Sequence, residues 1–181
     1  MAFLGLPVFG RHERAGFLLY GSVVKAAREP FYFSTLGVAD TLDGRFDLVG
    51  LFAAVLIRRL RLLPKPGAAL AQAVFDAMFA DMDINLRELG VGDMVIGKRV
   101  RVMWEAFHGR AVAYEAPLAA GDAAALAAAL ARNVWRGAAP DGAAARLSAL
   151  TLRQDAHLAG IGLDRLARGE VDFLAAPDGA A

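Results

Sequence analysis

The sequence predicts an all-α protein that forms a single globular helical domain of about six helices. The 181-residue chain contains 39 Ala and 25 Leu, two residue types with a strong preference for helix. Apolar residues recur at spacings of three and four over long stretches, which is typical of amphipathic helices. Gly and Pro separate these stretches, and the alternation of apolar and polar residues that a sheet needs appears nowhere for long.

The predicted helices lie between these Gly and Pro breaks. The clearest are 45–63, which Pro64 ends, and 68–89, whose broad apolar face includes Val74 and Met78. The full set is 12–28, 45–63, 68–89, 93–114, 121–136 and 142–160, with a short last turn at 162–168.

The aromatic segment 30–36 is expected to be a packed link between helices, although an extended conformation is also compatible with it. We place the domain at 11–168 and expect 1–10 and 169–181 to be flexible termini.

Composition and charge exclude several classes of protein. The 20 basic and 19 acidic residues give a formal net charge of +1, so the basic excess of a nucleic-acid binder is missing and no specific nucleic-acid partner is expected. The chain has no Cys, which excludes disulfide frameworks and Cys-ligated metals. The longest apolar run, 48–57, is far shorter than the roughly 20 residues of a membrane span.

No catalytic set is visible in the sequence. Ser22, Ser34 and Ser148 lack the glycines of a nucleophile elbow. His108 has no obvious partner, and the chain has no phosphate-binding loop. We therefore expect no enzymatic activity and no cofactor.

Carboxylates gather around the end of the predicted helix 68–89. The segment 81–85 resembles the opening of a calcium loop, but Leu86 stands where that loop needs Gly and Gly92 where it needs Glu. Asp83 can instead pair with Arg87 one helical turn later. We therefore predict structural roles in caps, ion pairs and loop hydrogen bonds, and no metal site, for Asp76, Asp81, Asp83, Glu88 and Asp93.

Two Gly- and Asp-rich segments, 37–47 and 90–93, are expected to form ordered turns that set the angles between helices. Asp43 is the predicted N-cap of the helix that follows the first turn. In the second turn, Gly90 is expected to stop one helix and Asp93 to cap the next.

Two basic groups remain as candidate partner-binding residues. An unpaired charge is costly to bury, so we expect most of these side chains to face solvent or a partner, beside exposed apolar residues. Ordinary solvated charge at helix ends is the alternative interpretation. The candidate set is Arg58, Arg59 and Arg61, then Lys98, Arg99 and Arg101, with Trp104 as an apolar candidate.

Three blocks of sequence resemble the ubiquinol–cytochrome c chaperone family, the assembly factors of respiratory complex III. The first is AREPFY (27–32) with GVADTLDGRFD (37–47), the second FDAMFADMD (75–83) with LRELGVGD (86–93), and the third AFHGRAVAY (106–114) leading to LARN (130–133). They follow the family's order over about 18–136. The motif residues on which we place structural roles are Asp40, Asp43, Gly44, Arg45, Asp76, Asp81, Asp83, Arg87, Glu88, Gly90, Gly92 and Asp93.

The resemblance implies an all-helical assembly chaperone without enzymatic activity. Its expected client is newly made cytochrome b, bound before or during haem insertion at the inner face of the membrane. We recognise no mitochondrial presequence, so we expect a bacterial member in the cytoplasm, peripheral to the inner membrane. An anionic membrane surface is a further expected contact. The alternative is a helical protein or enzyme that handles a small molecule such as quinone or haem.

Overall fold

Helices account for most of the chain in the computed structural model, which describes residues 10–88, 90 and 92–177. The described residues contain eight helices and no strand, which confirms the all-α prediction. Six are long and α2 and α8 have five residues each: α1 (Arg11–Ala27), α2 (Pro30–Ser34), α3 (Leu42–Arg61), α4 (Gly67–Glu88), α5 (Asp93–Ala120), α6 (Ala123–Val134), α7 (Ala143–Ala159) and α8 (Leu163–Ala167).

Helix α3 is the centre of the fold. Thirteen of its 20 residues are buried, including the whole apolar run 48–57. Helices α1, α4, α5, α6 and α7 all pack against it. Residues 48–57, which are too few to span a membrane, are therefore the part of α3 that its neighbours cover. Burial is expected for a helical segment without a polar face.

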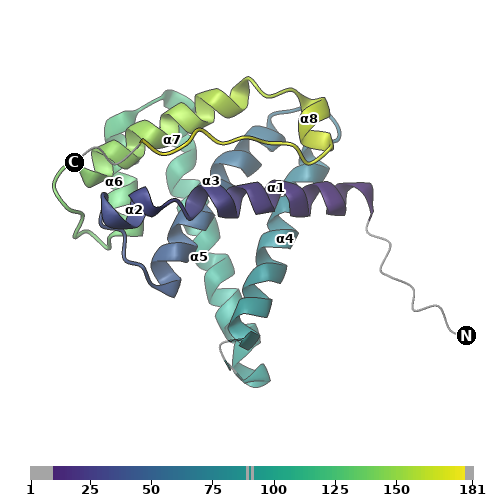
Figure 1. Ribbon diagram of the computed structural model, residues 1–181, viewed down its shortest axis with the longest axis horizontal. Coiled ribbons are helices and arrows are strands. Elements are labelled where there is room, and N and C mark those ends of the chain that lie inside the picture. The colour runs from purple at the N-terminus through teal and green to yellow at the C-terminus, as the bar shows by residue number, and fades with distance from the viewer. Residues whose placement is uncertain (1–9, 89, 91, 178–181) are drawn as a thin grey trace, which may run out of the picture.

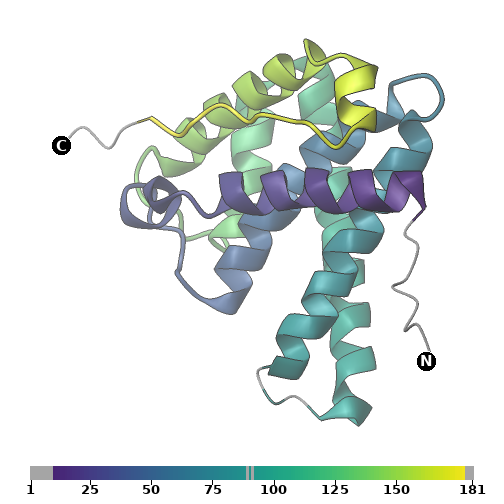
Figure 2. The same cartoon turned by 45° about the vertical axis from the view of Figure 1, so that its right-hand side comes forward.

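Helices α4 and α5 project from this body side by side, in both views of the molecule (Figures 1 and 2). The buried residues of the main core reach Met82 on α4 and resume at Phe107 on α5. We call the intervening hairpin, residues 83–106, the arm. Gly90 adopts a left-handed conformation with a φ of 75° at its tip, which favours glycine there.

Two elements differ from their predicted form. Helix α5 continues through Pro117 to Ala120, whereas we predicted its end at 114 and a break from Pro117 onward. Proline removes one helix hydrogen bond, but Leu118 is buried in the core and Gly121 adopts the left-handed conformation that ends the helix. The aromatic link is helical because Pro30 occupies the first position of α2.

Residues 170–177 pack against the body beside α7. They are therefore not the flexible terminus that we predicted from residue 169 onward. Phe173 stacks edge-on against Phe52 with ring centroids 5.4 Å apart. The Gln154 amide donates to the Leu174 carbonyl at 2.7 Å and accepts from the Leu174 amide at 2.9 Å. Of the predicted N-terminal flexible segment 1–10, all but Gly10 lies outside the described residues.

The turn before α3 corrects the predicted N-cap. Thr41 precedes the helix with an extended backbone, and its Oγ1 accepts the Gly44 amide at 3.2 Å. Asp43 lies within the first helical turn and is exposed. The turn is ordered as expected, since the Arg45 Nε donates to Asp40 at 2.6 Å and a side chain at Gly44 would overlap the Ala39 carbonyl.

Replacing Thr41 with Ala should lower the free energy of unfolding by about 1 kcal/mol, because the Gly44 amide loses its acceptor. Asp43→Ala removes only a charge near the positive end of the helix dipole and should cost about 0.5 kcal/mol or less. Urea unfolding of both variants measures this order. A larger loss for Asp43→Ala would contradict the assignment of Thr41 as the cap.

A candidate interaction surface on the helical arm

The first predicted basic group is largely engaged within the molecule. The Arg58 side chain is 14% exposed, and its Nη1 donates to Asp155 on α7 at 2.9 Å while its Nε donates to Glu115 on α5 at 3.1 Å. Arg58 thus ties α3 to both neighbouring helices. Hydrogen bonds between ionised groups of this kind are stronger than neutral ones.

Arg59 closes the end of α7. Its Nε and Nη2 donate to the carbonyl oxygens of Leu158 and Ala159 at 3.1 and 2.8 Å, where a helix leaves carbonyls without partners and a cation is favoured. Of the first group, only Arg61 is exposed.

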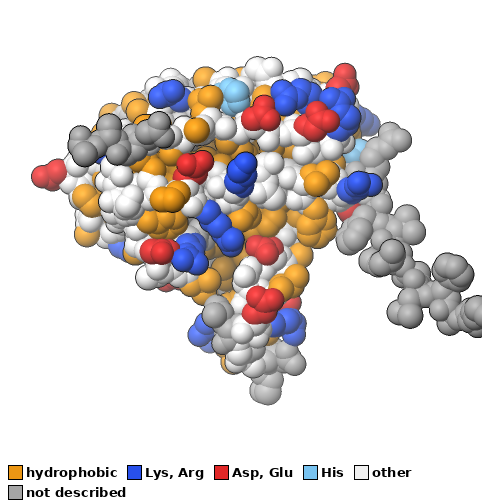
Figure 3. Space-filling model, viewed as in Figure 1, with side chains coloured by type: hydrophobic (Ala, Val, Ile, Leu, Met, Phe, Trp, Pro, Cys, Tyr) orange, Lys and Arg blue, Asp and Glu red, His pale blue; other side chains and the backbone are white. Residues whose placement is uncertain are grey.

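The second predicted group lies on the arm. Lys98, Arg99 and Arg101 are all exposed on α5, so four of the six predicted cations face solvent, as expected. On the face shown in Figure 3, Lys and Arg side chains lie on both sides of the arm near its tip. Arg101 pairs with Glu105 one turn away at 3.0 Å.

Large apolar side chains are exposed on the same arm. Trp104, the predicted apolar candidate, is 43% exposed, and Val112, just beyond the arm on α5, is 76% exposed. Isolated exposed apolar residues are common, but a concentration of them beside cations marks an interaction site. Among the residues of the arm whose side chains are described, the large exposed apolar ones are Ile84, Val95, Val102 and Trp104.

The exposed apolar and basic side chains of α5 divide between two flanks of the helix, because successive residues of a helix are 100° apart. We call the side that carries Arg101, Trp104, His108 and Val112 the outer flank. Trp104 stacks on His108 with ring centroids 4.1 Å apart. Arg58 and Arg61 of α3 line the same shallow hollow as His108 and Val112. Arg61 is the exposed one of the two, so one exposed cation of the first group joins this flank.

The other side of α5 borders an open groove of about 680 Å³ that extends to the beginning of α3. We call this side the groove flank. Val95, Lys98, Arg99 and Val102 line it from the arm. Lys98 and Arg99 therefore line this groove, whereas Arg101 and Trp104 do not.

A buried ion cluster fixes the base of the arm. Asp47 on α3 is buried, and its carboxylate pairs with Arg110 on α5 at 2.6 Å and with Arg136 after α6. Burial raises the pKa of the Asp47 carboxyl, and the two guanidinium groups oppose that shift. Arg110 also lies over the Phe46 ring, 5.3 Å from its centroid. The sequence analysis did not predict this cluster. The feature that could have indicated it is Asp47, an acidic residue directly before the longest apolar run.

The predicted structural acids make local contacts. Asp81 accepts the Tyr20 hydroxyl at 2.7 Å, and burial together with this bond raises the pKa of Tyr20. Asp76 accepts the Gln72 amide at 2.7 Å, and Asp83 accepts the Arg87 Nε at 2.6 Å. Within the described part of the chain, no group of His, Asp and Glu could hold a metal ion.

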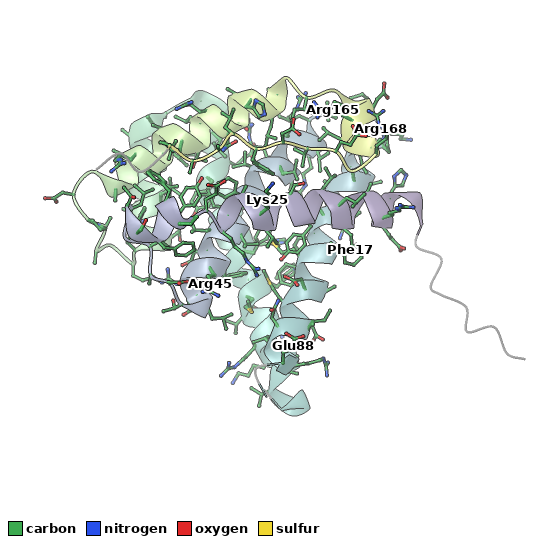
Figure 4. All side chains as sticks on the ribbon, in the orientation of Figure 1. Phe17, Lys25, Arg45, Glu88, Arg165 and Arg168 are labelled. Atoms are coloured by element: carbon green, nitrogen blue, oxygen red, sulfur yellow. The ribbon has the colours of Figure 1, made fainter. Side chains whose placement is uncertain are left out.

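The remaining motif residues lie around the tip of the arm. Glu88 is exposed near the tip, far from Arg45 at the beginning of α3 (Figure 4). Gly92 is the N-cap of α5, so Asp93 is the first helical residue rather than the predicted cap. The side chain of Asp93 lies outside the described residues.

None of the described helices is both long and apolar enough to cross a membrane.

Comparisons with known proteins give two matches. A family model described as ubiquinol-cytochrome C chaperone matches residues 34–173, which reaches 40 residues beyond the last of the three sequence blocks. The chain is similar to the crystal structure of the Cbp3 homolog from Brucella abortus, with 35% sequence identity, a TM-score of 0.81 and 91% of each chain covered. No curated protein matches the chain.

Arg58 and Arg61 make a matched test of which cations hold the fold. Arg58→Ala should lower the free energy of unfolding by about 2 kcal/mol, because it removes charged hydrogen bonds in a half-buried place and leaves Asp155 unpaired. Arg61→Ala changes an exposed charge and should stay within about 0.5 kcal/mol of the parent. Denaturant midpoints that fall equally in both variants would contradict this division.

The Asp47 cluster predicts a larger loss. Asp47→Ala leaves the mostly buried Arg110 without its counter-charge and should cost about 3–5 kcal/mol. Adding Arg110→Met should recover part of that stability, since the uncompensated charge is removed with its partner. Thermal unfolding of the single and double variants tests this, and a double variant less stable than Asp47→Ala would contradict it.

Proposed function

Because the chain belongs to the ubiquinol–cytochrome c chaperone family, we propose that it binds newly made cytochrome b and promotes biogenesis of the ubiquinol–cytochrome c reductase complex. The observation that carries this proposal is the arm, which exposes apolar side chains and cations on a protein of otherwise balanced charge. Such a surface suits a protein client better than it suits the chemistry of an enzyme.

The outer flank of α5 suits a client of this kind. Newly made cytochrome b presents apolar helices joined by charged loops. Trp104 and Val112 offer exposed apolar area, and Arg61 and Arg101 lie beside them. Aromatic and Arg side chains are enriched where proteins bind one another. Contacts between cations and acidic loops should weaken with salt.

The predicted partner-binding set divides accordingly. Arg61, Arg101 and Trp104 form the proposed client surface, and Lys98 and Arg99 remain partner-binding residues on the other flank. Arg58 and Arg59 have a structural role in this proposal, because their guanidinium groups hydrogen-bond to α5 and α7.

The proposed place of action is the cytoplasm of a bacterium, at the inner face of the inner membrane. The client is a membrane protein, so a chaperone that receives it must work beside the bilayer. The likeness to a Brucella abortus protein supports a bacterial setting. The proposed role is binding and release of the client, without a catalytic step.

A photo-crosslinking amino acid at position 104 or 112 should capture cytochrome b in cells, because both side chains project from the proposed client surface. The same probe at Arg153, an exposed position on α7, is the control and should capture little. Immunoblotting for cytochrome b measures the difference. Equal capture from all three positions, or none from any, would contradict the assignment.

The double variant Arg101→Glu with Trp104→Ala should stay folded and lower the cellular content of the reductase complex severalfold. Arg153→Glu is the matched charge control and should leave that content unchanged. A normal complex in the double variant would remove the outer flank from client binding.

A further inference from the structure

We propose that the groove flank of the arm docks the protein onto bilayers that contain acidic phospholipids. This deepens the proposed function, on which it rests for the claim that the protein works beside a membrane. It assigns the two flanks of α5 to different partners: the outer flank to the client and the groove flank to lipid.

The charge of the groove favours an anionic partner. Four cationic side chains line it, against one acid, Asp43. Within the described part of the chain neither Lys98 nor Arg99 forms an ion pair, whereas Arg101 on the other flank is paired with Glu105. Arg110 and Arg136 share the buried Asp47 beneath the groove, so that carboxylate balances only one of them. The groove keeps an excess of positive charge.

The rim of the groove is apolar as well as basic. Leu42, Val95 and Val102 are 44%, 47% and 56% exposed, and all three line the groove. Phe46 and Met103 line it deeper down. A helix face that combines exposed apolar side chains with Lys and Arg is typical of proteins that lie in the interface of an anionic membrane.

A phospholipid offers partners for both kinds of side chain in the groove, an anionic headgroup for the cations and acyl chains for the apolar residues. Guanidinium groups bind phosphate oxygens through paired hydrogen bonds, and Arg99, which forms no ion pair within the described part of the chain, lines the groove. The neighbouring valines can enter the boundary between headgroups and acyl chains. No described helix can cross the bilayer, so this contact is peripheral.

The geometry of α5 makes both contacts possible at once. Arg99 and Trp104 are five residues apart, which places them about 140° apart around the helix. A protein that rests on the bilayer through Val95, Arg99 and Val102 therefore keeps Trp104 uncovered. The client surface then lies on the side of α5 that faces away from the lipid, where it stays open to a client.

Vesicle flotation with purified protein tests the inference. The protein should float with vesicles of phosphatidylcholine and phosphatidylglycerol, not with phosphatidylcholine alone, and salt should weaken the binding. Lys98→Glu with Arg99→Glu should lower the binding at least about tenfold, since each cation near an anionic surface contributes substantially. Arg153→Glu, at the exposed position on α7, is the control and should change it less than about threefold.

Depth measurements separate docking from general charge attraction. The chain has no Cys, so single variants Val102→Cys and Val112→Cys can carry a spin label. On acidic vesicles the label at 102 should be shielded from a water-soluble relaxing agent, while the label at 112 should stay accessible. Equal accessibility at both positions would overturn the proposed orientation.

The remaining outcomes are distinct. Undiminished flotation of the Lys98→Glu, Arg99→Glu variant would overturn the groove as the lipid site, and loss of cytochrome b crosslinking in that same variant would assign the groove to an acidic client segment. Displacement of vesicles by inorganic phosphate at matched ionic strength would indicate a site for free anions instead. Failed flotation with intact crosslinking from position 104 would overturn only this inference, and intact flotation without crosslinking would overturn only the proposed function.

Discussion

The pairing of Asp47 with two arginines is the constraint on which the arm depends. A carboxylate buried in the central helix is tolerable only when opposite charges and hydrogen bonds compensate it. Arg110 supplies one partner from α5 and Arg136 the other from the turn after α6. Fixing Arg110 at Asp47 also fixes the rotation of α5 about its axis. That rotation turns Arg99 and Val102 toward the groove and Trp104 away from it.

Most of the fold could be predicted because helix periodicity and Gly or Pro breaks are local signals. The six long helices occur where the spacing of apolar residues places them. The errors arose where distant contacts decide. Helix α5 continues through Pro117 because Leu118 is buried in the core. Residues 170–177 are ordered because Gln154 hydrogen-bonds to this segment and Phe52 stacks against it. Thr41 and Asp43 are two residues apart and both are residue types that cap helices. The backbone conformation decides that Thr41 is the cap, and the sequence does not specify that conformation.

The candidate site shows the same limit at the level of single charges. In the sequence the two basic groups look alike. They differ in the structure because Asp155 and the carbonyls at the end of α7 meet Arg58 and Arg59, almost a hundred residues away along the chain. Nothing comparable faces Lys98 and Arg99 among the described residues. Trp104 could be selected from the sequence as an apolar residue near cations, but its exposure could not.

Folding alone does not explain the apolar surface of the arm. The arm has its own small interior, in which Leu86 and Ile96 are buried. Val95 and Val102 lie on another face of α5 and are exposed to solvent. Uncovered apolar area adds nothing to the stability of the isolated protein, and positions where a sequence departs from consistent burial are often functional. The body tolerates this because α3 and its neighbours carry the core, and Asp47 and Arg58 hold α5 in place. A rigid base and an uncovered arm are what a protein needs to present apolar contacts to a partner without losing its own fold.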